Sequence, residues 1–303
     1  MNKGICIAVL IILFIISGWY LHHRAFASSD LTLTAFKELN CKDNSTCDTP
    51  EHIPMVIYRS WKTKDLPRDY QLAWDFTTKN NPEYQQILYD DDEMDKFMET
   101  FYSGKVNNAY KKIIPNAARA DLFRYCLMYE KGGVWLDIKS AAKPLCNLIR
   151  KDDKLIISTW SEEQHGGIVN FMFHYFPVPP YRIFGEFQQW WIISAPKHPM
   201  IKAVIDIVVN NIETRIAEGR FEKEIPNHWF YHLGAQNAAA YSVDTLHTTG
   251  PIAFSDGILK SKSFSSDYRL VCSDGNGSMI YDYTGNHKGG ASYAGKGLFF
   301  RRD

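Results

Sequence analysis

The stretch that decides the fold class is ADLFRYCLMYEKGGVWLDIK, residues 120–139. The apolar residues in its first half recur with helical spacing, which predicts a helix from about Ala117 to Glu130. Asn116 is a candidate N-cap for this helix, and Gly132-Gly133 would end it. Asp121 and Arg124 lie three residues apart, so their side chains should lie on one face of the helix, away from its apolar stripe, and point the same way.

The second half of this stretch predicts a buried strand. Residues 134–138 are almost entirely apolar and carry one carboxylate, Asp137, near their end. Ligands of α/β domains bind beyond the carboxyl ends of the strands, so Asp137 is expected in a binding site and not in the core. An isolated pair such as Asp121 and Arg124 would be an ordinary surface ion pair worth about 0.2 to 0.5 kcal/mol, but the adjacent strand favours a functional role.

The flanking sequence extends the same α/β pattern. Residues 53–58 and 86–89 predict two further short strands, and residues 66–80 predict a helix between them. A long amphipathic helix is expected from Pro199 to about Gly219. A strand, helix and strand in succession indicate an α/β fold.

Composition excludes several classes of protein. The 303 residues carry 34 basic and 34 acidic side chains, with 45% hydrophobic residues, so the chain is neither disordered nor built to bind nucleic acid through net charge. The sequence also has no P-loop, no H-E-x-x-H and no G-x-S-x-G motif, which disfavours nucleotide hydrolysis, zinc proteolysis and esterase chemistry.

The N-terminus is expected to anchor the chain. Residues 4–21 are almost continuously apolar and would span about 27 Å as a helix, enough for a thin bilayer. A cleaved signal peptide is the alternative, because Ala25-Phe26-Ala27 offers a cleavage pattern. The expected organisation is an anchor over 1–24, a stem over 25–50 and one domain over 51–303. The chain would be a single-pass type II protein of the Golgi or endoplasmic reticulum lumen, or else secreted.

The cysteines fit an oxidising compartment. Cys41 and Cys47 lie close together in a polar stretch, where a local disulfide is plausible. Cys126, Cys146 and Cys272 are scattered, and no C-x-x-C pair indicates a zinc ribbon.

Five motifs in order resemble the DXD-containing sugar transferases of glycosyltransferase family 32. They are I-P-M-V-I-Y-R-S-W at 53–61, A-D-L-F-R-Y at 120–125, G-G-V-W-L-D at 132–137, the segment 189–199 that ends in P-K-H-P, and T-G-P at 249–251. The resemblance implies a GT-A fold, which is a Rossmann-like domain that binds nucleotide sugars, with additional helices after the membrane segment. It also implies a role for each matching position.

By that resemblance, Asp121 and Arg124 would hold hydroxyls of the donor sugar, and Trp61 would stack on the nucleobase. Asp137 would grip the ribose and a divalent metal. Asp121, Arg124 and Asp137 are therefore the expected catalytic residues, and Trp61, Lys139, Gln189 and Gly250 complete the expected nucleotide-sugar site.

Lys139 departs from the family pattern, because a second aspartate is expected at this position of the DXD motif. Two alternatives follow. Either Asp137 and His287 still coordinate Mn²⁺ or Mg²⁺, which is the reading favoured here, or Lys139 contacts the diphosphate and the metal is weakened or dispensable.

The implied activity is transfer of a sugar, with retention of configuration, from a UDP- or GDP-sugar to a glycan or glycolipid. A catalytically inactive relative that binds nucleotide sugar or glycan is the first rival, prompted by Lys139. A glycoside hydrolase is the second rival. It would need two carboxylates flanking the scissile bond, and the sequence pairs no second acid with Asp137.

Overall fold

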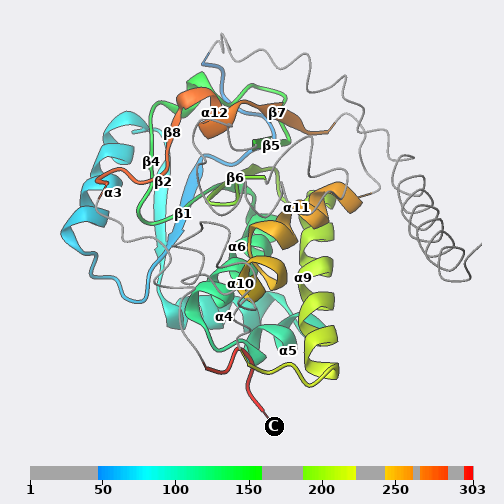
Figure 1. Cartoon of the computed structure of the whole chain (residues 1–303). Coiled ribbons are helices and arrows are strands. Elements are labelled where there is room, and N and C mark those ends of the chain that lie inside the picture. Colours follow the sequence, from blue (N-terminus) through cyan, green and yellow to red (C-terminus); the bar gives the residue numbers. More distant parts are fainter. Residues whose placement is uncertain (1–46, 159–186, 223–242, 262–266, 286–296, 303) are drawn as a thin grey trace, which may run out of the picture.

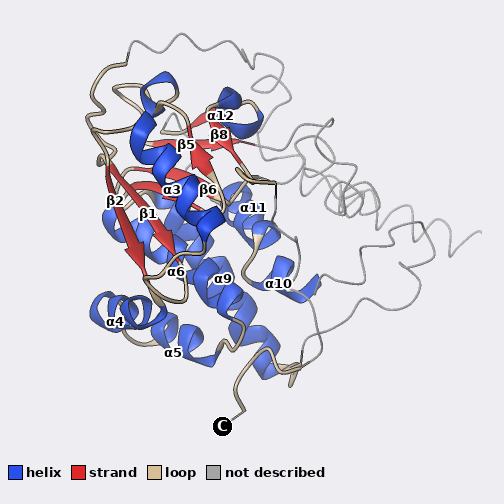
Figure 2. Cartoon of the chain, turned by 90° about the vertical axis from the view of Figure 1, so that its left-hand side faces the viewer, coloured by secondary structure: helices blue, strands red, loops and turns tan. Residues whose placement is uncertain are grey.

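A mixed β-sheet forms the centre of the computed structural model (Figures 1 and 2), which describes residues 47–158, 187–222, 243–261, 267–285 and 297–302. The six strands run in the order β2-β1-β3-β6-β5-β7. β1 is parallel to both of its neighbours and β5 is parallel to β7, whereas β6 is antiparallel to β3 and β5. Their bounds are β1 Val56–Ser60, β2 Gln85–Tyr89, β3 Gly133–Leu136, β5 Leu155–Ser158, β6 Trp191–Ser194 and β7 Arg269–Val271.

Helices surround this sheet, and a short antiparallel pair of strands, β4 (Ala141–Ala142) and β8 (Met279–Ile280), lies beside it. α6 packs on α9, which in turn packs on α11 (Figure 1). The helices are α3 Arg68–Asn80, α4 Asp91–Phe101, α5 Lys105–Lys112, α6 Asn116–Lys131, α9 Pro199–Ala217, α10 Val243–Thr248, α11 Pro251–Lys260 and α12 Ser273–Gly277, with a 3-10 turn at Leu145–Asn147.

The sheet separates two apolar clusters, because alternate strand residues point to opposite faces. Tyr58 and Trp135 pack among the buried residues of α4, α6, α9 and α11. Ile57 and Val134 pack on the other face, against residues of β4, β8 and the 3-10 turn. Burial on both faces explains why β3 reads as a continuous apolar run. The predicted α/β class is confirmed.

α6 and β3 form where the sequence predicts them, but the helix cap differs. Pro115 holds the N-cap position, so Asn116 is the first helical residue and its side-chain amide donates to Asp91 Oδ2 at 3.2 Å. The predicted Asn116 cap is therefore wrong, because the Pro115 carbonyl already accepts the first helical hydrogen bond, from Arg119 N–H at 3.0 Å. At the other end Gly132 adopts φ 64°, and a Cβ there would lie 2.6 Å from the Pro196 nitrogen. The double glycine thus ends α6 and lets the next strand pass close to β6.

A disulfide joins two regions that are distant in the sequence. Cys47 bonds to Cys146, 99 residues away, so the predicted pairing of Cys41 with Cys47 is wrong. The physical reason is local packing: Glu51 N–H donates to the Lys151 carbonyl at 2.8 Å, which brings these two segments together. Cys272 is also disulfide-bonded, and Cys126 is a buried free thiol.

Within the described residues, the structure contains no helix with the length and apolarity needed to cross a bilayer. The predicted anchor over 4–21 and most of the predicted stem lie outside the described residues.

Candidate active site

The candidate site lies beyond the carboxyl ends of β1 and β3. These parallel neighbours pair Ile57 with Val134 and Tyr58 with Trp135, so the residues that follow them, Trp61 and Asp137, emerge at the same edge of the sheet. α6 precedes β3 and runs back across the sheet, which places the first half of α6 at this edge. The sheet and one helix therefore bring the predicted residues to one place.

Arg124 joins the two carboxylates. Its Nη2 lies 3.0 Å from Asp121 Oδ1 and its Nη1 lies 3.0 Å from Asp137 Oδ1. The Asp121 side chain is fully buried, the Arg124 side chain is 7% exposed and the Asp137 side chain is 25% exposed. One guanidinium thus connects a carboxylate inside the protein to a carboxylate that solvent can reach.

Neighbouring side chains hold this group in place. Thr249 Oγ1 donates to Asp121 Oδ2 at 3.0 Å, and Gln189 Nε2 donates to Asp121 Oδ1 at 3.4 Å. Tyr125 donates its hydroxyl to Gln189 Oε1 and lies 2.9 Å from the Thr249 carbonyl. These contacts come from α6, the turn before β6 and the turn between α10 and α11, so three separate segments fix the orientation of Asp121.

Trp135 contacts both Asp137 and Arg124. Its indole Nε1 donates to Asp137 Oδ1 at 3.1 Å, and its ring lies 5.2 Å beneath the Arg124 guanidinium. Trp135 is 1% exposed, so it serves the core and also orients the carboxylate.

Burial dominates the electrostatics of Asp121. Burial raises the pKa of Asp121 to about 7, although Arg124 and the hydrogen bonds from Thr249 and Gln189 oppose this rise. A carboxyl group whose pKa is moved this far in a site of converging polar groups is typical of functional sites.

Arg59 fixes the backbone around Asp137. It was not among the predicted site residues. Its Nη1 donates to the carbonyls of Asp137, Ile138 and Ser140 at 3.3, 3.3 and 2.7 Å. Arg59 is fully buried, and burial lowers its pKa to about 9 while Asp137 opposes the shift. The signal in the sequence was a charged residue inside an otherwise apolar strand.

Lys139 lies at the exposed rim, against the chain segment that follows β8. Its Nζ is 2.7 Å from the Tyr281 hydroxyl and 4.0 Å from the centre of the Tyr281 ring. Tyr281 is 40% exposed and packs edge-on against Trp190 at 5.3 Å. Lys139 therefore has a defined position next to Asp137.

Trp61 is half-buried at the end of β1. Its ring meets Tyr70 of α3 edge-on at 4.8 Å. The indole Nε1 is buried and has no hydrogen-bond partner among the described residues. An aromatic face beside an unpaired donor is suited to stacking on a planar ligand with acceptor atoms.

Gly250 and His287 are the two remaining predicted site residues. Gly250 is buried at the start of α11, and its amide donates to the Thr245 carbonyl at 2.8 Å. A Cβ at this position would lie 2.9 Å from that carbonyl, so the absence of a side chain serves close packing beside Thr249. His287 lies outside the described residues.

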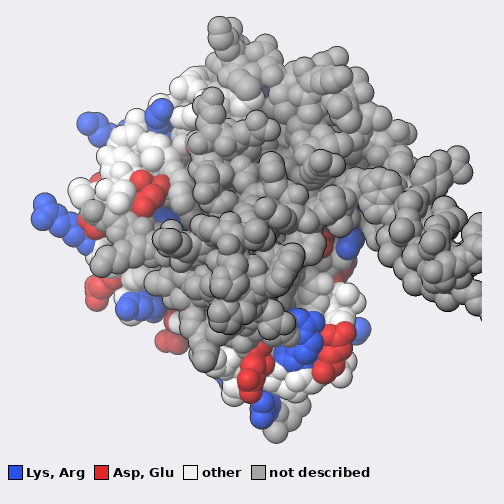
Figure 3. Space-filling model, viewed as in Figure 1, with Lys and Arg blue, Asp and Glu red and all other residues white. Residues whose placement is uncertain are grey.

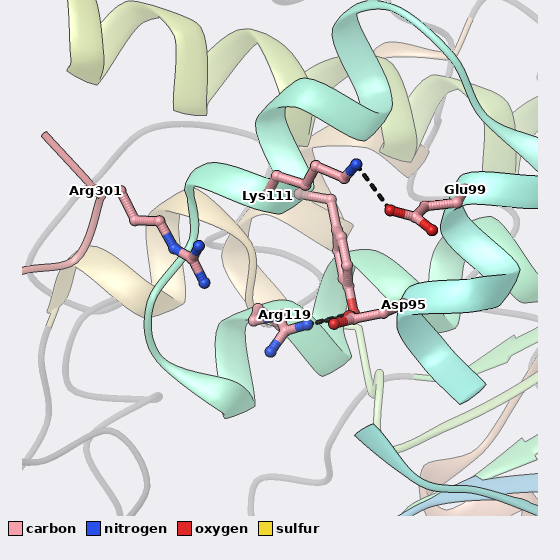
Figure 4. A pocket seen from close by; sticks show the side chains of 6 residues that line it. Asp95, Glu99, Lys111, Arg119 and Arg301 are labelled. Carbon is pink, nitrogen blue, oxygen red and sulfur yellow. Dashed lines mark hydrogen bonds and ion pairs between the residues drawn. The ribbon is translucent and has the colours of Figure 1, made fainter. Parts of the chain in front are cut away.

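A separate charged cavity lies on a different face of α6 (Figure 4). It has a volume of about 210 Å³ and contains two ion pairs, Arg119 with Asp95 and Lys111 with Glu99, the latter at 2.8 Å. Arg301 from the C-terminal segment completes its charged lining. None of the predicted site residues line it.

Figure 3 shows one face of the molecule, where the visible charged side chains of the described residues alternate in sign.

The comparisons with known proteins agree with the motifs. The family described as "Glycosyltransferase sugar-binding region containing DXD motif" matches residues 67–156, which include α6, β3 and Asp137. The resemblance to the DXD glycosyltransferases is confirmed. The end of β3, with Asp121, Arg124 and Asp137, therefore lies inside the residues that match this family.

Individual relatives of the DXD glycosyltransferase type are mannosyltransferases. An initiation-specific alpha-1,6-mannosyltransferase of Candida albicans is 26% identical over 228 residues, which cover 70% of this chain and 54% of that protein. The corresponding Saccharomyces cerevisiae enzyme is 22% identical, covering 74% of this chain and 58% of its own. Inositol phosphoceramide mannosyltransferase 3 of Schizosaccharomyces pombe is 33% identical over 86 residues, 28% of this chain and 24% of that protein.

The chain thus spans little more than half the length of the two initiation-specific enzymes. Among solved structures, the PaToxG glycosyltransferase matches 70% of this chain and 71% of its own length, with 17% identity and a TM-score of 0.41.

Proposed function

We propose that this protein is a glycosyltransferase that moves a hexose from a nucleotide diphosphate sugar to a glycan or glycolipid. The observation that carries the proposal is the Arg124 cluster, in which Asp121 and Asp137 share one guanidinium at the end of β3. This cluster lies inside the region that matches the DXD sugar-binding family.

The exposure of the three side chains supports a donor-sugar site. Asp137 is the most exposed of them, so it is the group that an entering sugar or ribose meets first. Arg124 lies behind it, and Asp121 lies deepest. Fixed polar groups in a site of low dielectric stabilise developing charge more strongly than the same groups in water.

The wider rim supports binding of the nucleotide. Trp61 offers an aromatic face and an unpaired indole N–H at the neighbouring strand end. Lys139, two residues after Asp137, offers a cation that contacts the Tyr281 hydroxyl. An aromatic, an acidic and a basic group suit the base, the ribose and the diphosphate of a nucleotide sugar.

Mannose is the sugar that we propose first, because the relatives named above are mannosyltransferases of glycans and of inositol phosphoceramide. GDP-mannose is accordingly the first donor to test, with UDP-sugars as the alternative. A GT-A-type fold with retention of configuration is part of the same proposal and comes from the family resemblance.

The expected divalent metal does not fit the described residues. Asp137 Oδ1 already accepts from Arg124 and Trp135, and the described ranges contain no group of three His, Cys, Asp or Glu side chains placed to hold an ion. Mn²⁺ and Mg²⁺ require several oxygen ligands. His287, the second expected ligand, lies outside the described residues, so no step of the proposed reaction is assigned to a metal.

The compartment is a further part of the proposal. Disulfides at Cys47–Cys146 and at Cys272 support an oxidising environment such as the secretory pathway. The apolar run over 4–21 supports a type II anchor in the Golgi or endoplasmic reticulum, or a cleaved leader and secretion.

The rival functions receive less support. In a glycoside hydrolase two carboxylates face the scissile bond from both sides, whereas here a guanidinium lies between Asp121 and Asp137 and one carboxylate is fully buried. An inactive sugar-nucleotide binder would share the same site, so activity itself must decide.

The test is release of nucleoside diphosphate by the purified full-length chain from a panel of GDP- and UDP-sugars, with a mannoside acceptor and with Mn²⁺ and EDTA arms. We expect release from at least one donor, and a loss of about 100-fold or more in Asp137→Asn. Binding of a donor without release would support the inactive relative. Release that is unchanged in Asp137→Asn would exclude the proposed site.

A further inference from the structure

Lys139 is placed where it can stabilise the leaving group of the proposed reaction, which is the nucleoside diphosphate. This residue stands where the DXD pattern has its second carboxylate, two residues after Asp137. An ammonium at this position removes an oxygen ligand and repels a cation. The same ammonium is a positive charge that can face the diphosphate where a divalent ion otherwise would.

The backbone around Lys139 is fixed on both sides. Arg59 donates to the carbonyls of Asp137, Ile138 and Ser140, as described above. The Lys139 carbonyl accepts from Tyr283 N–H at 3.1 Å, and Ser140 Oγ donates to the Tyr281 carbonyl. Next to these hydrogen bonds, β4 pairs with β8, so residues 139–142 and 279–283 run side by side.

The side chain is also positioned. The Tyr281 hydroxyl and ring hold Nζ at 2.7 and 4.0 Å, and the Tyr281 ring itself rests against Trp190. A lysine on an open surface samples many rotamers, and ordering it costs roughly 2 kcal/mol. Here the Tyr281 contacts already order the side chain before a ligand binds, so less entropy is lost when the ammonium contacts an anion.

We propose that the Lys139 ammonium, and not a divalent metal, neutralises the diphosphate of the donor; this inference rests on the proposed function. In the reaction the bond between the sugar C1 and the diphosphate oxygen breaks, and its electron pair stays on that oxygen. The acceptor hydroxyl oxygen forms the new bond to C1, and its proton passes to the departing diphosphate. Lys139 keeps its proton and stabilises the charge that develops on the diphosphate.

The test compares four full-length proteins, stripped with EDTA and then assayed with and without added Mn²⁺. They are the parent, Lys139→Gln, Lys139→Arg and the control Lys143→Gln, which removes an exposed lysine from the adjacent strand end. We expect the parent rate in EDTA to lie within about twofold of its rate in Mn²⁺. We expect Lys139→Gln to lose about 10²- to 10³-fold, with Lys139→Arg retaining most activity and Lys143→Gln unchanged.

Nucleotide binding gives a readout that does not depend on turnover. Calorimetry in EDTA should show that the parent binds GDP or UDP at least about tenfold more tightly than GMP or UMP, and that Lys139→Gln loses most of this preference. Retained binding of the monophosphate by Lys139→Gln would show that the variant is folded.

Two results would overturn the inference and leave the proposed function intact: a parent enzyme that is inactive in EDTA and restored by Mn²⁺, or a Lys139→Gln variant that equals the parent in both assays. A parent that neither binds nor uses any nucleotide sugar, with or without metal, would overturn both.

Discussion

Two arginines of one helix make different kinds of ion pair. Arg124 lies between Asp121 and Asp137 at the end of β3, with both carboxylates at 3.0 Å and little exposure. Arg119 pairs with Asp95, whose side chain is 49% exposed, and lines the charged cavity of Figure 4. The residue types are the same, so their placement makes the difference. Arg119 contacts Asp95 of α4 and Tyr110 of α5, whereas Arg124 faces the end of a strand.

The largest expected effect comes from truncating each arginine in turn. Arg124→Ala leaves two carboxylates facing each other without a cation, which should cost about 3 to 5 kcal/mol of unfolding free energy and abolish sugar transfer. Arg119→Ala breaks a partly exposed pair and should cost less than about 1 kcal/mol with activity retained. Urea denaturation and donor turnover measure both. Equal losses in the two variants would remove the distinction drawn here.

The next largest effect compares Asp137 with Asp95, the two carboxylates that pair with these arginines and that solvent can reach. Asp137→Asn keeps the size of the side chain and removes its charge, so donor turnover should fall about 10²- to 10³-fold. Asp95→Asn, the matched change in the charged cavity, should leave turnover within about twofold. Steady-state rates with the preferred donor decide this, and a comparable fall in Asp95→Asn would place the chemistry elsewhere.

The pH dependence of stability should reveal the buried member of the Arg124 cluster. The folded-state pKa of Asp121 is about 7 against 3.8 for an ordinary aspartate, so the folded protein holds a proton that the unfolded chain loses. Stability from this group is therefore greatest below about pH 4 and declines as pH rises to about 7. Urea midpoints of the parent should fall relative to those of Asp121→Asn across this window, whereas parallel midpoints would refute it.

The smallest effect concerns one hydrogen bond. Thr249→Val removes the donor to Asp121 Oδ2 while keeping a branched side chain, and should cost about 1.5 to 3 kcal/mol. Thr100→Val in α4 removes an exposed hydroxyl that bonds only within its own helix, and should change stability by less than about 0.5 kcal/mol. A Thr249→Val variant as stable as Thr100→Val would show that Thr249 does not support the site.

The sequence predicted the local elements of the site. The apolar spacing of residues 117–130, the double glycine and the apolar strand are all short-range signals, so α6 and β3 fall where they were expected. The rule that α/β ligands bind at strand ends then placed Asp137 correctly at the edge of the sheet. The structure brings Asp121, Arg124 and Asp137 together as that reasoning required.

The partners from distant parts of the chain could not be predicted in this way. Arg59 binds carbonyls 78 to 81 residues away, and Cys47 pairs across 99 residues. Tyr281 reaches Lys139 only because β8 pairs with β4. Such contacts depend on how strands are ordered, which no periodicity within one segment specifies.

The most direct test of the central claim is an experimental structure of the full-length chain with the nucleotide sugar that it turns over. We predict that the sugar lies within hydrogen-bond distance of Asp137 and Arg124 and that the base lies near Trp61. A donor bound in the charged cavity around Arg119, or away from both clusters, would contradict it.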